Sequence, residues 1–188
     1  TLLEADAVIN QNVVINNSAT LEYVNSLIGS ADDDPNVIVN GSVTINTTTF
    51  SPAITAPQLA EVNAIAAKLA TVLGSGSTTD GVIVTSATPI AFTSLSFIDD
   101  DYTISGADMD DDALRTVSGN LSASHGGAAV AFDYSQLSSI GGNLIIAAAD
   151  AATATSIDIS NVAITGTVAT IAGQSGNLTF PAATSVDL

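Results

Sequence analysis

The feature that most constrains the fold is a short motif that recurs at nearly constant spacing in the second half of the chain. The motif reads Val117-Ser118-Gly119-Asn120-Leu121, then Ile140-Gly141-Gly142-Asn143-Leu144, then Ile164-Thr165-Gly166-Thr167-Val168. Its last residue steps by 23 residues, from 121 to 144, and then by 24 residues, from 144 to 168. A spacing of about 20 to 30 residues is typical of solenoids, in which each coil covers the apolar face of the next coil.

A second motif moves in phase with the first. Its copies are Phe132-Asp133-Tyr134-Ser135, Ile157-Asp158-Ile159-Ser160 and Val186-Asp187-Leu188. Within a unit, the glycines permit a tight turn before a short apolar strand such as residues 144–146. An asparagine precedes a leucine at positions 120, 143 and 177, which fits either a stacked ladder of side chains or a simple turn preference. We therefore predict a mainly β fold in which residues 83–188 form β-solenoid coils of 23–24 residues.

Residues 1–82 differ from the rest and predict a mixed α/β region. Thr55 and Gln58 have the spacing of a capping box, with a proline between them in the first turn. Apolar residues then recur at helical spacing until Gly74, so we expect a helix over about 57–73.

A shorter helix is expected over about 19–28. Helices beside the first coils are suited to close one end of the stack.

The composition limits the partners. The chain has 2 Lys and Arg against 19 Asp and Glu, for a net charge of -17, so phosphate-rich nucleic acid is repelled and no nucleic-acid partner is expected. No apolar run is long enough for a membrane span, so no membrane insertion is expected. Chains without Cys, poor in Lys and rich in Ser, Thr and Asn are common outside bacterial cells. The predicted location is therefore extracellular or on the cell surface.

Aspartates gather in three runs, at 32–34, at 99–101 and at 108 with 110–112. Calcium takes about six to eight oxygen ligands, so closely spaced carboxylates in loops suit it. The pattern of an EF-hand is not met. The candidate metal ligands are Asp99, Asp101, Asp108, Asp110 and Asp112. Solvated acidic turns without a bound ion are the other interpretation, and Ca²⁺ is the only cofactor that the sequence suggests.

Catalytic residues are sparse, and we predict that the chain is not an enzyme. His125 is the only histidine, and no serine lies in a G-x-S-x-G motif. Paired aspartates cleave glycosides in some proteins, but sugar-binding grooves usually contain Trp or Tyr, and this chain has no Trp and only 3 Tyr.

Both ends of the chain carry features that suggest self-association. Apolar residues alternate with polar ones near the start, and the chain ends where another coil is expected to begin. The candidate self-association residues are Leu3, Ala5, Ala7, Ile9, Val186 and Leu188. An open coil or strand edge invites pairing with another chain. The other interpretation is a longer repeat protein that has been cut at this point.

Two segments carry a family resemblance. "SSIGGNLII" before "ATSIDIS", and "SGNLTFPAATSVDL", resemble coils of receptor L-domain and leucine-rich-repeat-like surface proteins over about residues 95–188. Alanine stands where many leucines are expected, and the LxxLxLxxN pattern is absent. The resemblance implies an extracellular binding or adhesion module.

The predicted function is that of an extracellular structural protein. The chain is expected to be a self-associating subunit or segment of a surface filament, sheath or adhesin, with copies of itself as the partner. It acts by stacking of coil ends or by strand addition. The alternative is a monomeric repeat module that binds a surface glycan or protein, and a carbohydrate-active enzyme ranks third.

Overall fold

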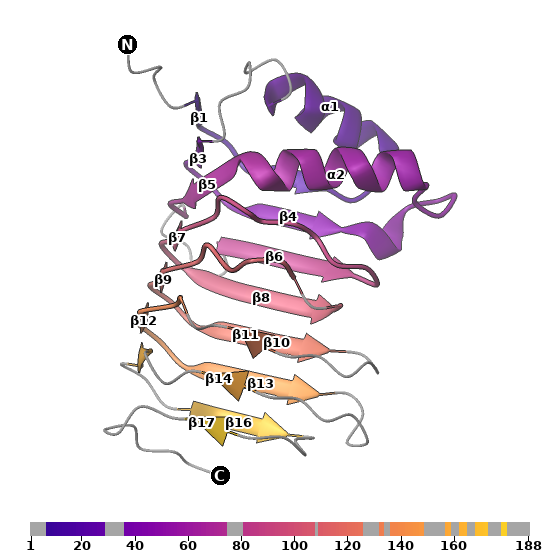
Figure 1. Cartoon of the computed structure of the whole chain (residues 1–188). Coiled ribbons are helices and arrows are strands. Elements are labelled where there is room, and N and C mark those ends of the chain that lie inside the picture. Colours follow the sequence, from indigo (N-terminus) through magenta and orange to yellow (C-terminus); the bar gives the residue numbers. More distant parts are fainter. Residues whose placement is uncertain are drawn as a thin grey trace.

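Parallel strands dominate the structure. The computed structural model describes residues 7–28, 36–74, 81–107, 109–125, 132–133, 136–148, 157–158, 162–164, 168–172 and 178–179. Two seven-stranded sheets and one three-stranded sheet run through these residues, and every strand pairing in them is parallel. Figure 1 shows the strands as successive layers, with both helices at the N-terminal end of the molecule.

The chain alternates between the first two sheets, so consecutive strands usually lie in different sheets. The first sheet contains β1 (Ala7–Ile9), β3 (Val37–Val39), β5 (Leu69–Val72), β7 (Phe97–Ile98), β9 (Thr116–Val117), β12 (Ser139–Ile140) and β15 (Ala163–Ile164), in that order. The second sheet contains β2 (Val13–Ile15), β4 (Val43–Asn46), β6 (Gly81–Ser86), β8 (Asp101–Gly106), β10 (Leu121–His125), β13 (Leu144–Ala148) and β16 (Val168–Ala172). The third contains β11 (Phe132–Asp133), β14 (Ile157–Asp158) and β17 (Leu178–Thr179).

Equivalent positions of neighbouring strands form columns of side chains. In the first sheet, the register aligns one aliphatic column: Ile9, Val39, Val72, Ile98, Val117, Ile140 and Ile164. β-Branched side chains pack well against one another on a pleated surface, which favours this column. Its five internal members are 0% exposed, whereas the two end members are only partly buried. We call this set the aliphatic column.

The two predicted helices are present and cover the N-terminal end. Helix α1 (Ser18–Ile28) lies between β2 and β3 and contacts both β2 and the second helix. Helix α2 (Ala56–Lys68) follows a short 3₁₀ turn, η1 (Thr47–Thr49), and leads into β5. The predicted capping box is confirmed: the Thr55 side chain accepts from the Gln58 N–H, and the Gln58 side chain accepts from the Thr55 N–H at 3.0 Å.

The expected fold class, a mainly β solenoid of 23–24-residue coils, is wrong. The chain has an α/β fold of parallel sheets with two helices, and no closed solenoid is found among the described residues. Paired strands are 30 residues apart at Ala7 and Val37, but 19 apart at Phe97 and Thr116. Helices lengthen the connections in the first half, so a period taken from the second half does not extend to the whole chain.

The predicted end of the longer helix is also wrong. Helix α2 ends at Lys68, and residues 69–72 form strand β5 instead of continuing to 73. Leu69 pairs with Val37, and Val72 pairs with Val39, so a bulge in β5 absorbs one residue. Residues three apart therefore both face the core. Apolar spacing that fits a helix thus also fits a bulged strand.

The register confirms most of the recurring motifs. Leu121 pairs with Leu144, and Leu144 pairs with Val168, as their 23- and 24-residue steps predict. In the third sheet Phe132 pairs with Ile157, but Ile157 then pairs with Leu178 rather than with Val186. The third copy of the second motif was therefore misplaced, and residues 186–188 lie outside the described part of the chain.

The proposed boundary between residues 82 and 83 falls inside strand β6. One hydrophobic core extends across it, from Val13 to Val162.

Candidate functional site

The Asp101 and Asn120 side chains form a hydrogen-bonded ladder between successive layers in the middle of the structure. The Asp101 Oδ1 accepts hydrogen bonds from the Asn120 backbone N–H at 2.6 Å and from its Nδ2 at 2.9 Å. The Asn120 Oδ1 in turn accepts from the Asn143 backbone N–H at 2.8 Å. The ladder interpretation is therefore confirmed for the Asn120 side chain, whereas Asn143 takes part through its backbone N–H and position 177 lies outside the described residues.

The other candidate metal ligands that the structure describes are exposed at the surface. Asp99 is exposed, and its backbone N–H donates to the Val72 carbonyl. Asp110 is exposed, and its backbone carbonyl accepts from the Phe92 N–H at 2.7 Å. Asp112 is also exposed, and its backbone carbonyl accepts a hydrogen bond from the Arg115 side chain.

Asp108 lies outside the described residues. Within the described ranges, no three acidic or histidine side chains come together to hold an ion. Calcium binding stays a prediction.

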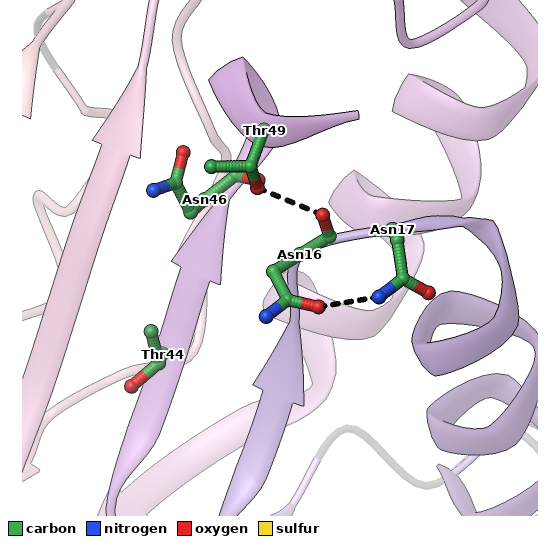
Figure 2. Close-up of a pocket in the computed structure, with 5 residues that line it drawn as sticks. All are labelled: Asn16, Asn17, Thr44, Asn46 and Thr49. Carbon is green, nitrogen blue, oxygen red and sulfur yellow. Dashed lines mark hydrogen bonds between the residues drawn. The ribbon is translucent and has the colours of Figure 1, made fainter. Parts of the chain in front are cut away.

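A polar pocket of about 340 Å³ lies where β2 and β4 end, beside the start of α1. Figure 2 shows its lining residues, Asn16, Asn17, Thr44, Asn46 and Thr49. The Asn17 Nδ2 donates to the Asn16 Oδ1 at 2.7 Å, and the Thr49 hydroxyl donates to the Asn16 carbonyl at 2.8 Å. Amide and hydroxyl groups of this kind can hydrogen-bond a polar ligand, but the pocket has no charged group and no aromatic ring.

A second pocket, of about 380 Å³, lies at the N-terminal end of the first sheet. Its lining residues, Val8, Ile9, Asn10, Gln11, Tyr23 and Leu27, come from β1, the turn after it and α1. Three of them are large apolar or aromatic residues that remain accessible: Val8 is 50% exposed, Tyr23 53% and Leu27 37%. The Gln11 Nε2 donates to the Tyr23 hydroxyl at 3.0 Å, which holds the ring beside β1. We call this set of six residues the β1 pocket.

The backbone of β1 is open on one side. The Ile9 carbonyl accepts from the Asn40 N–H at 2.8 Å, so Ile9 directs its backbone groups toward β3. Successive residues of a strand direct these groups to opposite sides, so the Val8 N–H and carbonyl point away from β3. No strand of the described residues lies on that side of β1. Edges of this kind are templates for pairing with another chain.

The far end of the same sheet is also open among the described residues. Strand β15 is the last in the order, and its only described neighbour is β12. The Ala163 N–H donates to the Ser138 carbonyl at 2.9 Å, so the backbone groups of Ala163 face β12. Val162 and Ile164 therefore direct their backbone groups outward.

Of the candidate self-association residues, the structure describes only Ala7 and Ile9. Both lie in β1, are partly buried against the core and pair with β3 of the same chain. Leu3, Ala5, Val186 and Leu188 lie outside the described residues.

Sequence reasoning missed Val8, Tyr23, Leu27 and Ile164. The sequence could have indicated Val8, because it is an apolar residue on the same strand face as the charged Glu4 and Asp6. No sequence pattern indicated Tyr23 and Leu27, because their position beside β1 depends on how α1 packs.

Comparison with known proteins gives no match to a protein family, to a curated protein or to a solved structure. The resemblance to receptor L-domain and leucine-rich-repeat-like proteins, and the expectation that the chain is not an enzyme, stay predictions. In the described part of the chain, neither helix has the length and apolar content needed to cross a membrane.

Proposed function

We propose that this chain is an extracellular structural protein that associates with copies of itself, as a subunit or segment of a surface filament, sheath or adhesin. The observation that supports this most directly is the incomplete burial at the ends of the aliphatic column. Ile9 and Ile164 are partly buried, while the five residues between them are 0% exposed. Covering such apolar surface is favourable by about 25 cal/mol per Å².

The charge distribution supports contact at these ends rather than elsewhere. The chain carries a net charge of -17, so two copies repel each other over most of their surfaces. None of the six residues of the β1 pocket is charged, and neither are Val162, Ala163 and Ile164 at the other end. Repulsion between copies is screened by salt, so association is expected to strengthen as sodium chloride is raised.

The test removes one outward-facing backbone donor. Val8→Pro eliminates the Val8 N–H, which points away from β3, and leaves the ladder between β1 and β3 intact. The contact between copies then loses one backbone hydrogen bond, and the proline ring restricts the backbone of the edge strand. Together these changes should weaken association at least about tenfold. Sedimentation velocity and electron microscopy across a range of protein and salt concentrations measure this effect.

The matched control is Val8→Thr, which keeps the N–H and the β-branched shape. It should associate nearly as well as the wild type. Unfolding in urea checks that Val8→Pro leaves the monomer folded. A wild-type chain that stays monomeric at every salt concentration contradicts the proposal.

The polar pocket of Figure 2 supports a second candidate, a monomeric module that binds a surface glycan. Thr44→Val removes one hydroxyl from the lining while keeping the side-chain shape. The measurement is binding to a panel of immobilised glycans. If the wild-type chain stays monomeric and binds a glycan, and the variant loses that binding, this candidate is favoured over the structural one.

A further inference from the structure

We infer that the copies associate head to tail, with strand β15 of one copy added in parallel to strand β1 of the next. This inference rests on the proposed self-association and names the two segments that meet. A second copy of the chain is the partner that fits the β1 edge, because the outward backbone groups and side chains of β1 match those of β15.

Among the described residues, the directions of the backbone groups fit one register. In a parallel pair, one residue bonds to the residues before and after its partner. The outward groups are those of Val8 on β1 and those of Val162 and Ile164 at β15. The Val8 N–H therefore donates to the Val162 carbonyl, and the Ile164 N–H donates to the Val8 carbonyl. This places Val8 opposite Ala163.

The side chains agree with the same register. Ile9 then lies opposite Ile164, and both are partly buried residues that face the core. The contact thus extends the aliphatic column from one copy into the next and buries its two end members. Val8 and Ala163, which lie opposite each other, are both exposed residues on the outer face. A shift by one residue would place outward-facing side chains against the column.

The second sheet does not continue in the same way. Helix α1 contacts β2, and Figure 1 shows both helices at this end of the molecule. The contact therefore uses the first sheet alone, with Tyr23 and Leu27 of the β1 pocket beside it. The two surfaces that meet are different, so each copy retains one free end. Heterologous contacts of this kind form filaments when the rotation between copies does not close a ring.

Cysteine cross-linking tests the register, because the natural chain has no Cys and each single variant therefore carries only the introduced thiol. Neighbouring strands lie about 4.8 Å apart, within the range of Cα separations that a disulfide spans. Val8→Cys and Ala163→Cys are prepared separately, mixed at a salt concentration where the wild type associates, and oxidised mildly. Mass spectrometry then identifies the linked peptides. Val8→Cys mixed with Ser118→Cys, which is exposed on an internal layer, is the matched control.

The expected result is a heterodimer linked between positions 8 and 163, at least tenfold more abundant than either homodimer or the control product. The double variant should give a ladder of linked oligomers. If most of the product is the homodimer of Val8→Cys linked through position 8 of both copies, the inference is overturned in favour of a symmetric contact between two β1 edges. Association in sedimentation without a link between positions 8 and 163 overturns this register and leaves self-association standing. A wild-type chain that never associates overturns both.

Discussion

The interior and the ends of the first sheet use the same type of side chain at equivalent positions, but bury it to different extents. Ile98 and Val117 in the middle of the aliphatic column are 0% exposed, whereas Ile9 and Ile164 at its ends are partly buried. The residue type alone does not distinguish them. Burial here depends on whether a strand lies on both sides, so the same sequence pattern stabilises the fold in the middle and leaves apolar surface available at the ends.

The largest expected effect comes from truncating the column in its interior. Ile98→Ala should lower the free energy of unfolding by about 2–5 kcal/mol, because it removes buried methyl groups and leaves a cavity. Ile9→Ala at the end of the column should cost about 1 kcal/mol, since part of that side chain is already in contact with water. Urea unfolding of both variants at a low protein concentration measures the difference. Equal losses for the two variants would contradict the comparison.

A middle-sized effect is expected in the ladder of polar side chains. Asn120→Ala removes both the acceptor for the Asn143 N–H and the donor to the Asp101 carboxylate, so it should cost about 2 kcal/mol. Asn10 at the N-terminal end accepts from the exposed Asn40 side chain at 2.7 Å, and Asn10→Ala should change stability by about 0.5 kcal/mol or less. The same urea titration compares them. A loss at Asn10 as large as the loss at Asn120 would show that the ladder has no special role in the interior.

A small effect within the ladder itself is expected for Asp101→Asn. The new side chain keeps an oxygen that can accept from Asn120, and it removes one negative charge next to two other aspartates, so stability should change by less than about 1 kcal/mol. The measurement is thermal unfolding with calcium and with a chelator. If Asp101 is a calcium ligand, the wild type is stabilised by calcium and the variant loses that stabilisation. Glu22→Gln, which changes an exposed acid on α1 outside the candidate metal ligands, is the control.

Several features of the fold could be predicted from the sequence because they depend on short-range chemistry. The start of α2 follows from Thr55 and Gln58, whose side chains cap the first turn whatever surrounds it. The pairing of Leu121 with Leu144, and of Leu144 with Val168, follows from a motif that repeats with its turn residues. The alternation near the start of the chain predicts that Ala7 and Ile9 share one strand face, and the structure packs both partly against the core.

Other features depend on contacts between residues distant in the sequence. Residues 69–72 have an apolar spacing that a helix and a bulged strand satisfy equally, and pairing with Val37 and Val39 selects the strand. Likewise, Ile157 pairs with Leu178 although the sequence motif recurs at Val186.

The candidate site likewise combines features that short-range chemistry fixes with features that depend on distant contacts. The sequence by itself determined that this chain is strongly acidic, that it has short apolar strands separated by turns, and that Ala7 and Ile9 share one strand face. Only the tertiary structure decided that no described strand lies on the outer side of Val8, that Tyr23 and Leu27 lie beside it, and that Ile164 is the last described member of the same column. The physical reason is that capping and alternation are properties of a few neighbouring residues, whereas an edge is defined by which strands are absent from one side of a sheet.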